Sequence, residues 1–533
     1  MNDIARGQNV GSVWAAAVRT CGDRPFLVWL SADGSRQEFS YREFDGRINR
    51  AANALTGLGV GDGDLVAVQL RNSPDFVTCL FALAKLGAVT VPIALGASPA
   101  EVARMTAACR PAWTIVDTSC ADMHRALRRD NAASGVRGPL IEVGATRAHD
   151  DTLDLADACR RASPLPPAVG TVDSGALAEL LYTSGTTAEP KGVMVTQANL
   201  VFAGHYGVWE TGLRPDDRLF TPMPACHSNF QLAALMPVLV AGACLILAEA
   251  YSAHRFWEQV RQNDATVIQI ISMIVRTMLL QPPSPHDCDH RVRDALFFMG
   301  LSDAEKDAFE QRFAVPLLNT YGSTESIGWA LTDPPVGERR WPSVGRPGLG
   351  YEVGVFDADN RELPAGQVGE IRIKGTPGTS LMAGYYGNPE QTRQVLLPGG
   401  WLRTYDLGYR DADGWFYYAG RDRDVIKRSG ENISALELER VLTAHPEIAE
   451  AAVVGVPDPI RDEAVMAFVR RVPGSVLSAQ DVVDYCRREL IDFKVPSQVE
   501  FVDDFPRTPS MKIEKRLLCP SVVGTQRHKE VEK

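Results

Sequence analysis

The sequence predicts an α/β protein with a large N-terminal domain of layered α/β subdomains, a small antiparallel unit within it, and a small α+β C-terminal domain. Residues 1 to about 170 alternate short apolar strands with helix-like segments, which is typical of a largely parallel sheet covered by helices. From Tyr351 onward the strands are shorter, which favours an antiparallel unit. The length of 533 residues exceeds what one hydrophobic core can hold, so several subdomains are expected.

Apolar runs mark the strands of the first part of the chain. Four of these runs lie at residues 65–68, 89–91, 113–116 and 140–143. After the first run, Ser73 is a good N-cap residue and Pro74 suits the first turn of a helix. Gly87 is placed to end that helix before the next strand. The order strand, helix, strand indicates a parallel α/β unit.

Two later strands end in glycine-containing turns. The strand expected at 295–299 ends at Gly300, and the strand expected at 315–319 ends at Tyr321 and Gly322. Such turns lie at one edge of an open α/β sheet, where these sheets bind ligands. We expect ligand atoms to meet at this edge.

A domain boundary is predicted near residue 421. The expected parts are an N-terminal domain at 1–420, a C-terminal domain at 421–520 and a disordered tail at 521–533. Shortly after the boundary, Ser434 and Glu437 predict a capping box at the start of a helix.

Composition and charge exclude several classes of protein. A net charge of -11 disfavours a nucleic-acid partner, because binding phosphates needs a basic face. Ten cysteines without a C-x-x-C pair, and an N-terminus without an apolar signal core, favour a reduced cytoplasmic setting. The uncharged run 232–248 is interrupted at Pro237 and at 241–243. It therefore predicts a buried helix and strand, not a membrane span.

The segment 180–192 has the chemistry of a phosphate cradle. Hydroxyl and glycine residues follow an apolar run there, namely Thr183, Ser184, Gly185, Thr186 and Thr187. Glycine lets backbone N–H groups approach an anion, the hydroxyls donate hydrogen bonds, and Lys191 adds a positive charge. The segment is not a Walker loop, because Pro190 precedes the lysine and Gly192 follows it.

Four further motifs follow this segment. They are Tyr321-Gly322-Ser323-Thr324-Glu325, Thr404-Tyr405-Asp406, Gly420-Arg421 through Gly430, and Pro506-Arg507-Thr508 through Lys512. In this order they make the chain resemble, nearly from end to end, the adenylate-forming superfamily of acyl-CoA ligases, luciferases and nonribosomal adenylation domains. The resemblance implies that a carboxylate attacks the α-phosphate of MgATP, giving an acyl-adenylate and pyrophosphate. A thiol, usually that of CoA, then displaces AMP.

The resemblance also implies roles on the phosphate side. Lys191 and the hydroxyls of the phosphate segment would hold the β- and γ-phosphates, and Thr324 would contact the α-phosphate. Glu325 would hold Mg²⁺, a hard cation that keeps few carboxylate ligands, together with Thr187. Lys512 would bridge the substrate carboxylate and the α-phosphate, neutralising charge as the reaction centre forms.

Other motif residues would bind the nucleoside. Tyr321 would lie against adenine, whereas Asp406 and Arg421 would contact the ribose. Tyr405 departs from the family pattern, since it stands where glycine is usual.

The family further implies a mobile C-terminal domain that rotates between the two half-reactions. Arg423 occupies the pivot position, where Asp or Lys is usual. Lys512 would be present for adenylation only, and Lys427 and Gly430 would face the site during thioester formation. Met511 replaces a glycine that is usual before the catalytic lysine. We expect adenylation to survive these departures better than the thiol step.

The motifs do not determine which carboxylic acid is the substrate. Residues 278–283, 301–307 and 339–343 are most similar to crotonobetaine/carnitine-CoA ligases. A trimethylammonio substrate needs an aromatic wall or a buried carboxylate. The aromatic candidates are Trp329, Phe230, Tyr206 and Trp209, and the candidate pocket residues are His227, Met299, Gly300, Gly322 and Trp329. Phe298, Met299 and Trp329 would equally suit an aryl or short aliphatic acid.

Two other functions stay open. An adenylating enzyme of specialised metabolism would pass the acyl group to an amine or a carrier protein, or activate nitrite for diazotisation. A non-catalytic nucleotide-binding protein is disfavoured by the joint presence of Lys191, Glu325, Asp406, Arg421 and Lys512. The expected ligands are ATP, Mg²⁺, CoA and a small carboxylic acid, and a homodimer is compatible with the sequence.

Overall fold

The computed structural model describes residues 5–129, 140–144, 152–183, 191–298, 300–421, 425–506, 513 and 515–518. The chain divides into two compact units. The first comprises Met1–Leu95, Val102–Thr183 and Lys191–Asp422, and the second comprises Gly96–Glu101, Ser184–Pro190 and Arg423–Lys533. Among the described residues, no helix has the length and apolar character needed to cross a membrane.

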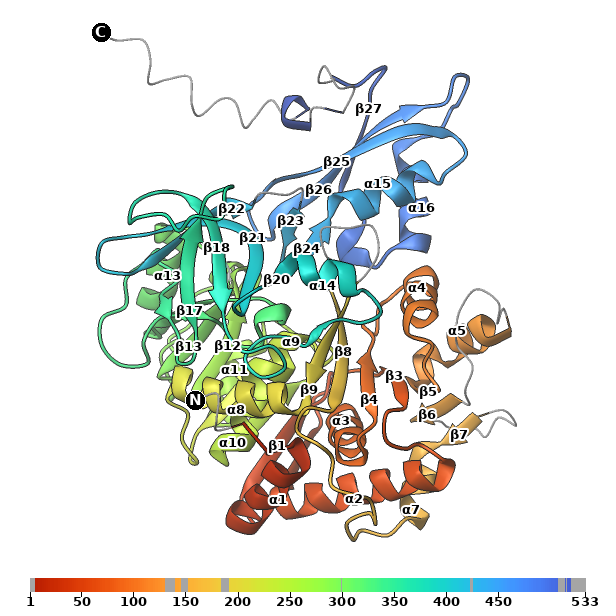
Figure 1. Ribbon diagram of the computed structural model, residues 1–533, viewed down its shortest axis with the longest axis vertical. Coiled ribbons are helices and arrows are strands. Elements are labelled where there is room, and N and C mark those ends of the chain that lie inside the picture. The colour runs from red at the N-terminus through yellow and green to blue at the C-terminus, as the bar shows by residue number, and fades with distance from the viewer. Residues whose placement is uncertain are drawn as a thin grey trace. The chain divides into compact units, whose positions relative to one another are not determined.

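An eight-stranded sheet contains the predicted strands of the first part of the chain (Figure 1). Its order is β19 (Gly384–Tyr385), β9 (Lys191–Thr196), β8 (Leu177–Thr183), β4 (Val89–Pro92), β3 (Leu65–Gln69), β5 (Trp113–Asp117), β6 (Leu140–Val143) and β7 (Thr152–Asp154). The strands from β8 to β7 are parallel, whereas β9 and β19 run antiparallel at one edge. The prediction of a largely parallel sheet is therefore confirmed.

A nine-stranded sheet forms the second layer of the first unit. Its order is β16 (Arg346–Pro347), β15 (Leu331–Thr332), β14 (Leu317–Tyr321), β13 (Asp294–Phe298), β12 (Val267–Ile271), β10 (Arg218–Thr221), β11 (Cys244–Ala248), β1 (Pro25–Leu30) and β2 (Arg36–Ser40). The six strands from β14 to β1 are parallel. Their carboxyl ends therefore share one edge, as the glycine-containing turns predicted.

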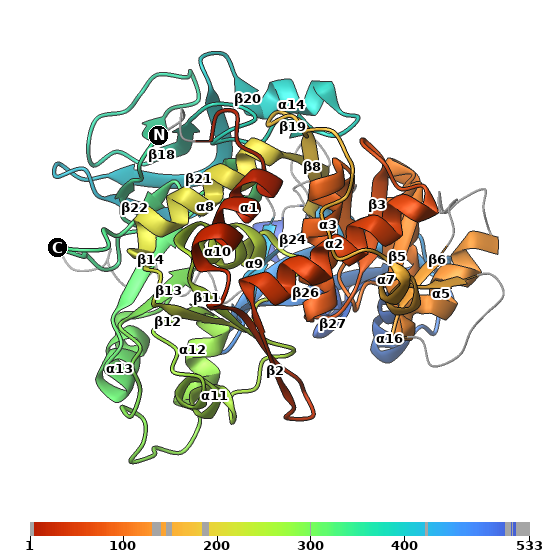
Figure 2. The same ribbon diagram turned by 90° about the horizontal axis from the view of Figure 1, so that it is seen from below.

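Helices cover these sheets. The α-helices described before residue 400 are α1 (Val10–Cys21), α2 (Tyr41–Leu58), α3 (Pro74–Leu86), α4 (Pro99–Cys109), α5 (Thr118–Arg129), α7 (Leu155–Arg161), α8 (Gln197–Thr211), α9 (Ser228–Phe230), α10 (Met236–Ala241), α11 (Phe256–Gln262), α12 (Ser272–Leu279), α13 (Asp303–Phe313) and α14 (Pro389–Val395). The predicted caps of α3 are confirmed: Ser73 accepts a hydrogen bond from the Phe76 amide, and Gly87 ends the helix at φ 76°. Helices α1, α8 and α10 pack together (Figure 2).

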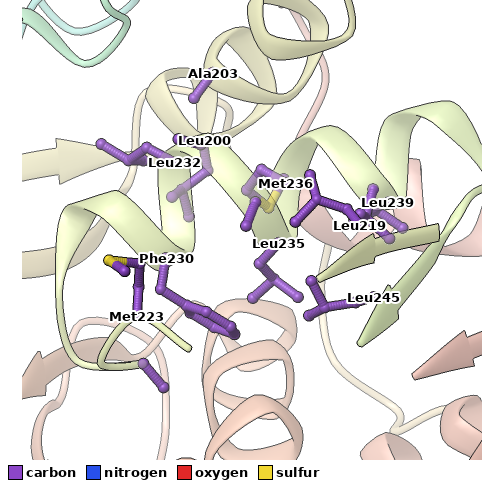
Figure 3. Packing of buried hydrophobic residues seen from close by; sticks show 14 of the residues in the cluster. Leu200, Ala203, Leu219, Met223, Phe230, Leu232, Leu235, Met236, Leu239 and Leu245 are labelled. Carbon is purple, nitrogen blue, oxygen red and sulfur yellow. The ribbon is translucent and has the colours of Figure 1, made fainter. Parts of the chain in front are cut away.

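The apolar run 232–248 lies in the hydrophobic core of the first unit. A π-helix, η1 (Gln231–Leu235), precedes α10, and Gly242 ends α10 at φ 69° before β11 begins. Figure 3 shows side chains of α8, η1, α10, β10 and β11 packed together. The buried helix and strand are thus confirmed, but the π-helical segment was not predicted.

Two smaller sheets complete the fold, an antiparallel one in the first unit and a mixed one in the second unit. In the first unit the strands are β17 (Glu352–Phe356), β18 (Gly369–Lys374), β21 (Trp401–Arg410), β20 (Leu396–Leu397) and β22 (Phe416–Arg421). This sheet confirms the antiparallel unit predicted from Tyr351 onward.

The second unit has an α+β fold. Its elements are β23 (Val425–Arg428), β24 (Glu431–Ser434), α15 (Ala435–Thr443), β25 (Ile448–Asp458), β26 (Asp462–Arg471), α16 (Ala479–Glu489), η3 (Asp492–Lys494), β27 (Gln498–Phe501) and η4 (Lys515–Leu517). The capping box predicted for α15 is only half formed, because Ser434 accepts from the Glu437 amide. The Glu437 carboxylate instead accepts a hydrogen bond from Lys494 Nζ at 3.0 Å. The buried lysine therefore takes the carboxylate that a capping box would use.

Candidate active site

The predicted phosphate segment connects two paired strands. In the β8–β9 hairpin Thr183 lies opposite Lys191, so the two ends of the segment are adjacent. Its central residues, Ser184, Gly185, Thr186 and Thr187, lie outside the described residues. The Thr183 hydroxyl is buried and has no hydrogen-bond partner among the residues that the structure describes. A buried hydroxyl costs free energy when it is left unpaired, so its position favours a ligand oxygen at this point.

Lys191 and Glu325 are joined through Tyr385. The Lys191 ammonium lies 5.2 Å from the centre of the Tyr385 ring, within cation–π range. The Tyr385 hydroxyl donates a hydrogen bond to Glu325 Oε1 at 2.9 Å. Strand β19 holds Tyr385 in place by pairing it with Val193 of β9. Tyr385 was not predicted from the sequence, because a single aromatic residue outside the motifs carries no signal of its own.

The turn after β14 carries the other predicted phosphate contacts. Thr324 and Glu325 lie in the short 3-10 helix η2 (Thr324–Ser326). The Thr324 hydroxyl is 3.0 Å from the Ser228 hydroxyl, and the Glu325 carbonyl accepts from the Met382 amide at 2.9 Å. Ser228 was also missed, although it directly follows the predicted His227. These contacts fix the two residues from opposite sides.

His227 ends the turn before α9. Its carbonyl accepts hydrogen bonds from the amides of Phe230 and Gln231, at the start of the π-helix η1. π-Helical turns are rare and are frequent at functional sites. The placement of His227 beside Ser228, and hence beside Thr324, agrees with its predicted position near the site.

The nucleoside residues also lie together. The Tyr321 hydroxyl donates to Asp406 Oδ2 at 2.7 Å, and Asp406 pairs with Arg421 in the β21–β22 register. The side chain of Asp406 is buried, and its amide donates to the Thr404 hydroxyl at 3.1 Å. Tyr405 has φ 59°, in the left-handed region. This conformation explains why glycine would be favoured at the position of Tyr405.

The predicted acyl side centres on Trp329. Its ring centre is 4.5 Å from that of Phe298 at the end of β13. Gly322 packs so closely that a Cβ atom would lie 2.8 Å from the Gly328 carbonyl oxygen and 2.9 Å from Trp329 Cε3. A Cβ atom on Gly300 would meet nothing within 4 Å, and Met299 lies outside the described residues.

Two of the aromatic candidates lie in the hydrophobic core. Tyr206 is 1% exposed and Phe230 is 0% exposed, and both pack in the core of the first unit. The side chain of Trp209 is partly buried against the same core. Sequence position alone does not separate such core residues from pocket residues, since both are apolar and lie near the motifs.

The remaining predicted residues belong to the second unit. Lys427 lies in β23, where its amide donates to Glu463 Oε2 at 2.6 Å. Gly430 has φ 90° in the turn between β23 and β24, a conformation that favours glycine. Arg423 and Lys512 lie outside the described residues, and for Arg421 only the backbone pairing is described.

The donor set suits a magnesium ion that is shared with a nucleotide. No group of three or more His, Cys, Asp or Glu residues that could hold a metal is found within the described part of the chain. A lone, partly exposed carboxylate such as Glu325 fits Mg²⁺, which is commonly held by one or two carboxylates, phosphates and water. An all-protein metal cage is not needed for this chemistry.

The fold brings the predicted nucleotide residues of β14 and the turn after it into contact with Tyr385 of β19 and Asp406 of β21. Residues 13–386 match the family described as AMP-binding enzyme, and residues 437–512 match the AMP-binding enzyme C-terminal domain. The chain belongs to this family, the adenylate-forming ligases. The suspected resemblance is therefore confirmed.

Relatives cover the whole chain. Crotonobetaine/carnitine–CoA ligases of Salmonella paratyphi B and Salmonella typhimurium are each 42% identical over 520 residues, which is 97% of this chain and 100% of theirs. The structure of amide bond synthetase McbA from Marinactinospora thermotolerans has a TM-score of 0.83 at 27% identity, covering 95% of this chain and 98% of that one. ATP-bound MatB from Rhodopseudomonas palustris has a TM-score of 0.69 at 27% identity, covering 96% and 98%.

Proposed function

We propose that this protein is an AMP-forming acid–CoA ligase. A carboxylic acid attacks the α-phosphate of ATP to give an acyl-adenylate and pyrophosphate, and the thiol of CoA then displaces AMP. The observation that carries this proposal is the linked arrangement of Lys191, Tyr385 and Glu325, beside the hydrogen-bonded nucleoside pair of Tyr321, at the end of β14, and Asp406 of β21. The full-length similarity to CoA ligases at 42% identity supports the thiol acceptor.

The phosphate-side residues together bind the leaving pyrophosphate and balance its negative charge. Lys191 and the hydroxyls of Thr183, Ser184, Thr186 and Thr187 hold the β- and γ-phosphates. Glu325 and Thr187 would hold the Mg²⁺ ion, which neutralises phosphate charge when it is bound. Thr324, held by Ser228, donates to the α-phosphate. Tyr385 keeps the Glu325 carboxylate in place.

The nucleoside side fixes the sugar and the base. Asp406 accepts hydrogen bonds from the ribose hydroxyls, with Arg421 as a second contact, and Tyr321 lies against adenine. The hydrogen bond from Tyr321 to Asp406 holds the carboxylate beside the ring. Lys512 bridges the acid and the α-phosphate during the first step.

The C-terminal domain serves both steps in turn. It rotates about Arg423, which removes Lys512 after adenylation and presents Lys427 and Gly430 for the thiol step. A residue at a solvated pivot can change backbone conformation without breaking a core, so an arginine suits this position.

The acid proposed for the pocket is a trimethylammonio acid of the crotonobetaine or carnitine kind. The similar Salmonella enzymes are named for these acids, and Trp329, whose ring packs at a tilt against Phe298, offers an aromatic face to a quaternary ammonium group. Pyrophosphate release should be measured with crotonobetaine, carnitine, short aliphatic acids and aryl acids. A response to the aryl or aliphatic acids alone would contradict the trimethylammonio substrate.

A second candidate keeps adenylation and changes the acceptor. The structure of an amide bond synthetase is similar over nearly the whole chain, and Tyr405 and Met511 replace glycines that are usual in the family. The products of incubation with ATP, acid and CoA should be weighed by mass spectrometry. An acyl-CoA product supports the ligase, whereas AMP release without consumption of CoA supports an amine, carrier or nitrite acceptor.

A further inference from the structure

We propose that the hydroxyls of Tyr351 and Tyr206 are positioning groups that lock a strained turn behind Trp329 and so set the acyl side of the active site. This inference rests on the proposed function, because it assigns the turn to recognition of the acid. Within the described part of the chain, the hydrogen bonds of the two hydroxyls go to Ser326, Gly328, Trp329 and Ser380 and not to the predicted nucleotide residues.

The strained turn is Ser326–Ile327–Gly328. The Gly328 amide donates to the Ser326 carbonyl at 2.6 Å, which closes a three-residue γ-turn. Ile327, at its centre, has φ 61° and ψ -57°. This positive-φ γ-turn is rare and strained, above all for a β-branched residue. The surrounding structure must therefore hold the turn in place.

Two features of the turn itself supply part of this restraint. The Ile327 side chain is 2% exposed and belongs to the core of the first unit. The Ser326 hydroxyl accepts from the Ser323 amide at 2.8 Å and lies 2.9 Å from the Gly328 carbonyl, to which it can donate. The turn is thus tied to the segment that carries Thr324 and Glu325.

The Tyr351 hydroxyl closes both ends of the turn. It accepts from the Gly328 amide at 2.9 Å and lies 2.6 Å from the Ser326 carbonyl as donor, with the Ser380 carbonyl at 3.0 Å as a second acceptor. Its side chain is buried, and burial raises the pKa of the phenol well above its ordinary value, so the proton stays on the oxygen. A single hydroxyl therefore bonds the donor and the acceptor that define the γ-turn.

Tyr206 extends the lock to Trp329. Its hydroxyl donates to the Trp329 carbonyl at 2.5 Å, and its ring meets the Tyr351 ring edge to face at 5.5 Å. A Cβ atom on Gly328 would lie 2.7 Å from the Tyr351 hydroxyl oxygen and 3.2 Å from Tyr206 Cδ1. The backbone of 328–329 is thus pressed against the two tyrosines, while the Trp329 ring packs on Phe298.

The nucleotide residues have separate anchors. Glu325 is held by Tyr385 and by the Met382 amide, and Thr324 by Ser228. Loss of the Tyr351 hydroxyl should therefore move Trp329 more than it moves the phosphate contacts. The expected result is a change in the KM for the acid with little change in the KM for ATP.

The first test removes each hydroxyl alone. Tyr351→Phe and Tyr206→Phe should each raise the KM for the acid by roughly tenfold, because small displacements of a positioning group have large kinetic effects, and leave the KM for ATP within about twofold. Tyr41→Phe is the matched control: Tyr41 is 0% exposed and its hydroxyl also bonds backbone carbonyls, of Val238 and Ala243, but away from the turn. Equal changes in both KM values, or an effect of Tyr41→Phe on the acid alone, would overturn the proposal.

The second test relieves the strain. In the Tyr351→Phe background, Ile327→Gly should recover much of the affinity for the acid, because glycine adopts positive φ without strain. Ile327→Ala leaves nearly the same cavity but keeps a Cβ atom, so it should recover little. Equal recovery with glycine and alanine would show that strain is not what the hydroxyl controls.

A third readout does not depend on catalysis. Amide exchange at Gly328, followed by mass spectrometry, should rise several-fold in Tyr351→Phe and stay unchanged in Tyr41→Phe. If the wild-type protein activated no acid, the proposed function would be wrong. The exchange data would still show whether the Tyr351 hydroxyl holds the turn at Gly328. Unchanged exchange at Gly328 in Tyr351→Phe would refute the lock itself.

Discussion

Tyr385 links two charged residues that are far apart in the sequence. Its ring lies beneath the Lys191 ammonium, and its hydroxyl bonds Glu325. Mutation of a residue that orients a metal ligand typically lowers metal affinity or activity by about 10- to 100-fold. Tyr385 is therefore a positioning residue for the proposed magnesium carboxylate.

The variant Tyr385→Phe should lower pyrophosphate release about tenfold at limiting Mg²⁺, because the ring remains under Lys191 but Glu325 loses its hydrogen bond. Initial rates measured against Mg²⁺ concentration check this. Tyr417→Phe is the control, since it removes a hydroxyl contact to Asp411 in the β21–β22 hairpin. Wild-type dependence on Mg²⁺ in Tyr385→Phe would argue against the role.

Tyr405 adopts φ 59°, so it is strained by the presence of its Cβ atom. Tyr405→Gly and Tyr405→Ala both remove the ring and its contact with the Arg403 guanidinium. They differ in that only glycine relieves the backbone. We expect the glycine variant to be more stable than the alanine variant by about 1 kcal/mol, measured by denaturant unfolding. Equal stability would show that the backbone at 405 is not strained.

The sequence predicted the charged and polar residues of the motifs better than the residues that hold them in position. Glu325, Asp406 and Lys191 stand in motifs whose order is informative, and the structure brings Glu325 and Lys191 to one side chain, Tyr385. Tyr385 and Ser228 could not be predicted, because their roles depend on contacts across β9 and β14. The strained backbone at Ile327 could not be predicted either, because the residue type does not determine the backbone angles.

Strand β8 leads into the phosphate segment and contains a buried carboxyl group. Glu179 is 1% exposed, and neither of its carboxylate oxygens has a hydrogen-bond partner among the described residues. Burial raises the pKa of Glu179 to about 8 from an ordinary value of 4.5, so the group is protonated in the folded protein at neutral pH.

This group should make stability depend on pH. Between the ordinary value near 4.5 and the folded value near 8, the folded state binds a proton that the unfolded state has lost, so stability falls as pH rises. Glu179→Gln should remove this fall, whose slope approaches about 1.4 kcal/mol per pH unit. The difference in melting temperature between variant and wild type, measured from pH 5 to pH 8, should increase steadily. A constant difference would contradict the assignment.

At the element scale, strong local signals were sufficient for several predictions. The Ser73 cap and the Gly87 stop of α3 were read correctly, because both act through neighbouring backbone groups. The π-helix η1 was not predicted, since its extra residue per turn leaves no pattern in an apolar run. The capping box of α15 failed for a tertiary reason, namely that Lys494 binds the Glu437 carboxylate.

Lys512 is predicted to act in adenylation and not in thioester formation. Lys512→Ala should reduce adenylate formation by on the order of a hundredfold, because it removes a charge that stabilises the transition state. Conversion of a chemically prepared acyl-adenylate to the thioester should stay within a few-fold of wild type. Lys515→Ala removes a nearby lysine that is paired with Glu439 and serves as the control. Equal loss in both half-reactions would contradict the division of labour.

The class of protein was readable from the order of distant motifs. The structure places the 321–325 motif where the parallel strand β14 ends, and joins it by side-chain hydrogen bonds to Tyr385 and Asp406 on other sheets. The acid was not readable, because the predicted pocket residues are scattered over the end of β13, the turn after β14 and the turn before α9. Which of these side chains face the acid depends on how they pack in the folded protein, and proteins that share the motifs can differ in this packing.

The proposed ligase activity is tested most directly by an analysis of the products that the wild-type protein forms from MgATP, CoA and a panel of carboxylic acids. We expect AMP, pyrophosphate and an acyl-CoA in equal amounts, with each product dependent on the acid. Formation of ADP and phosphate, or release of AMP without the acid, would contradict it.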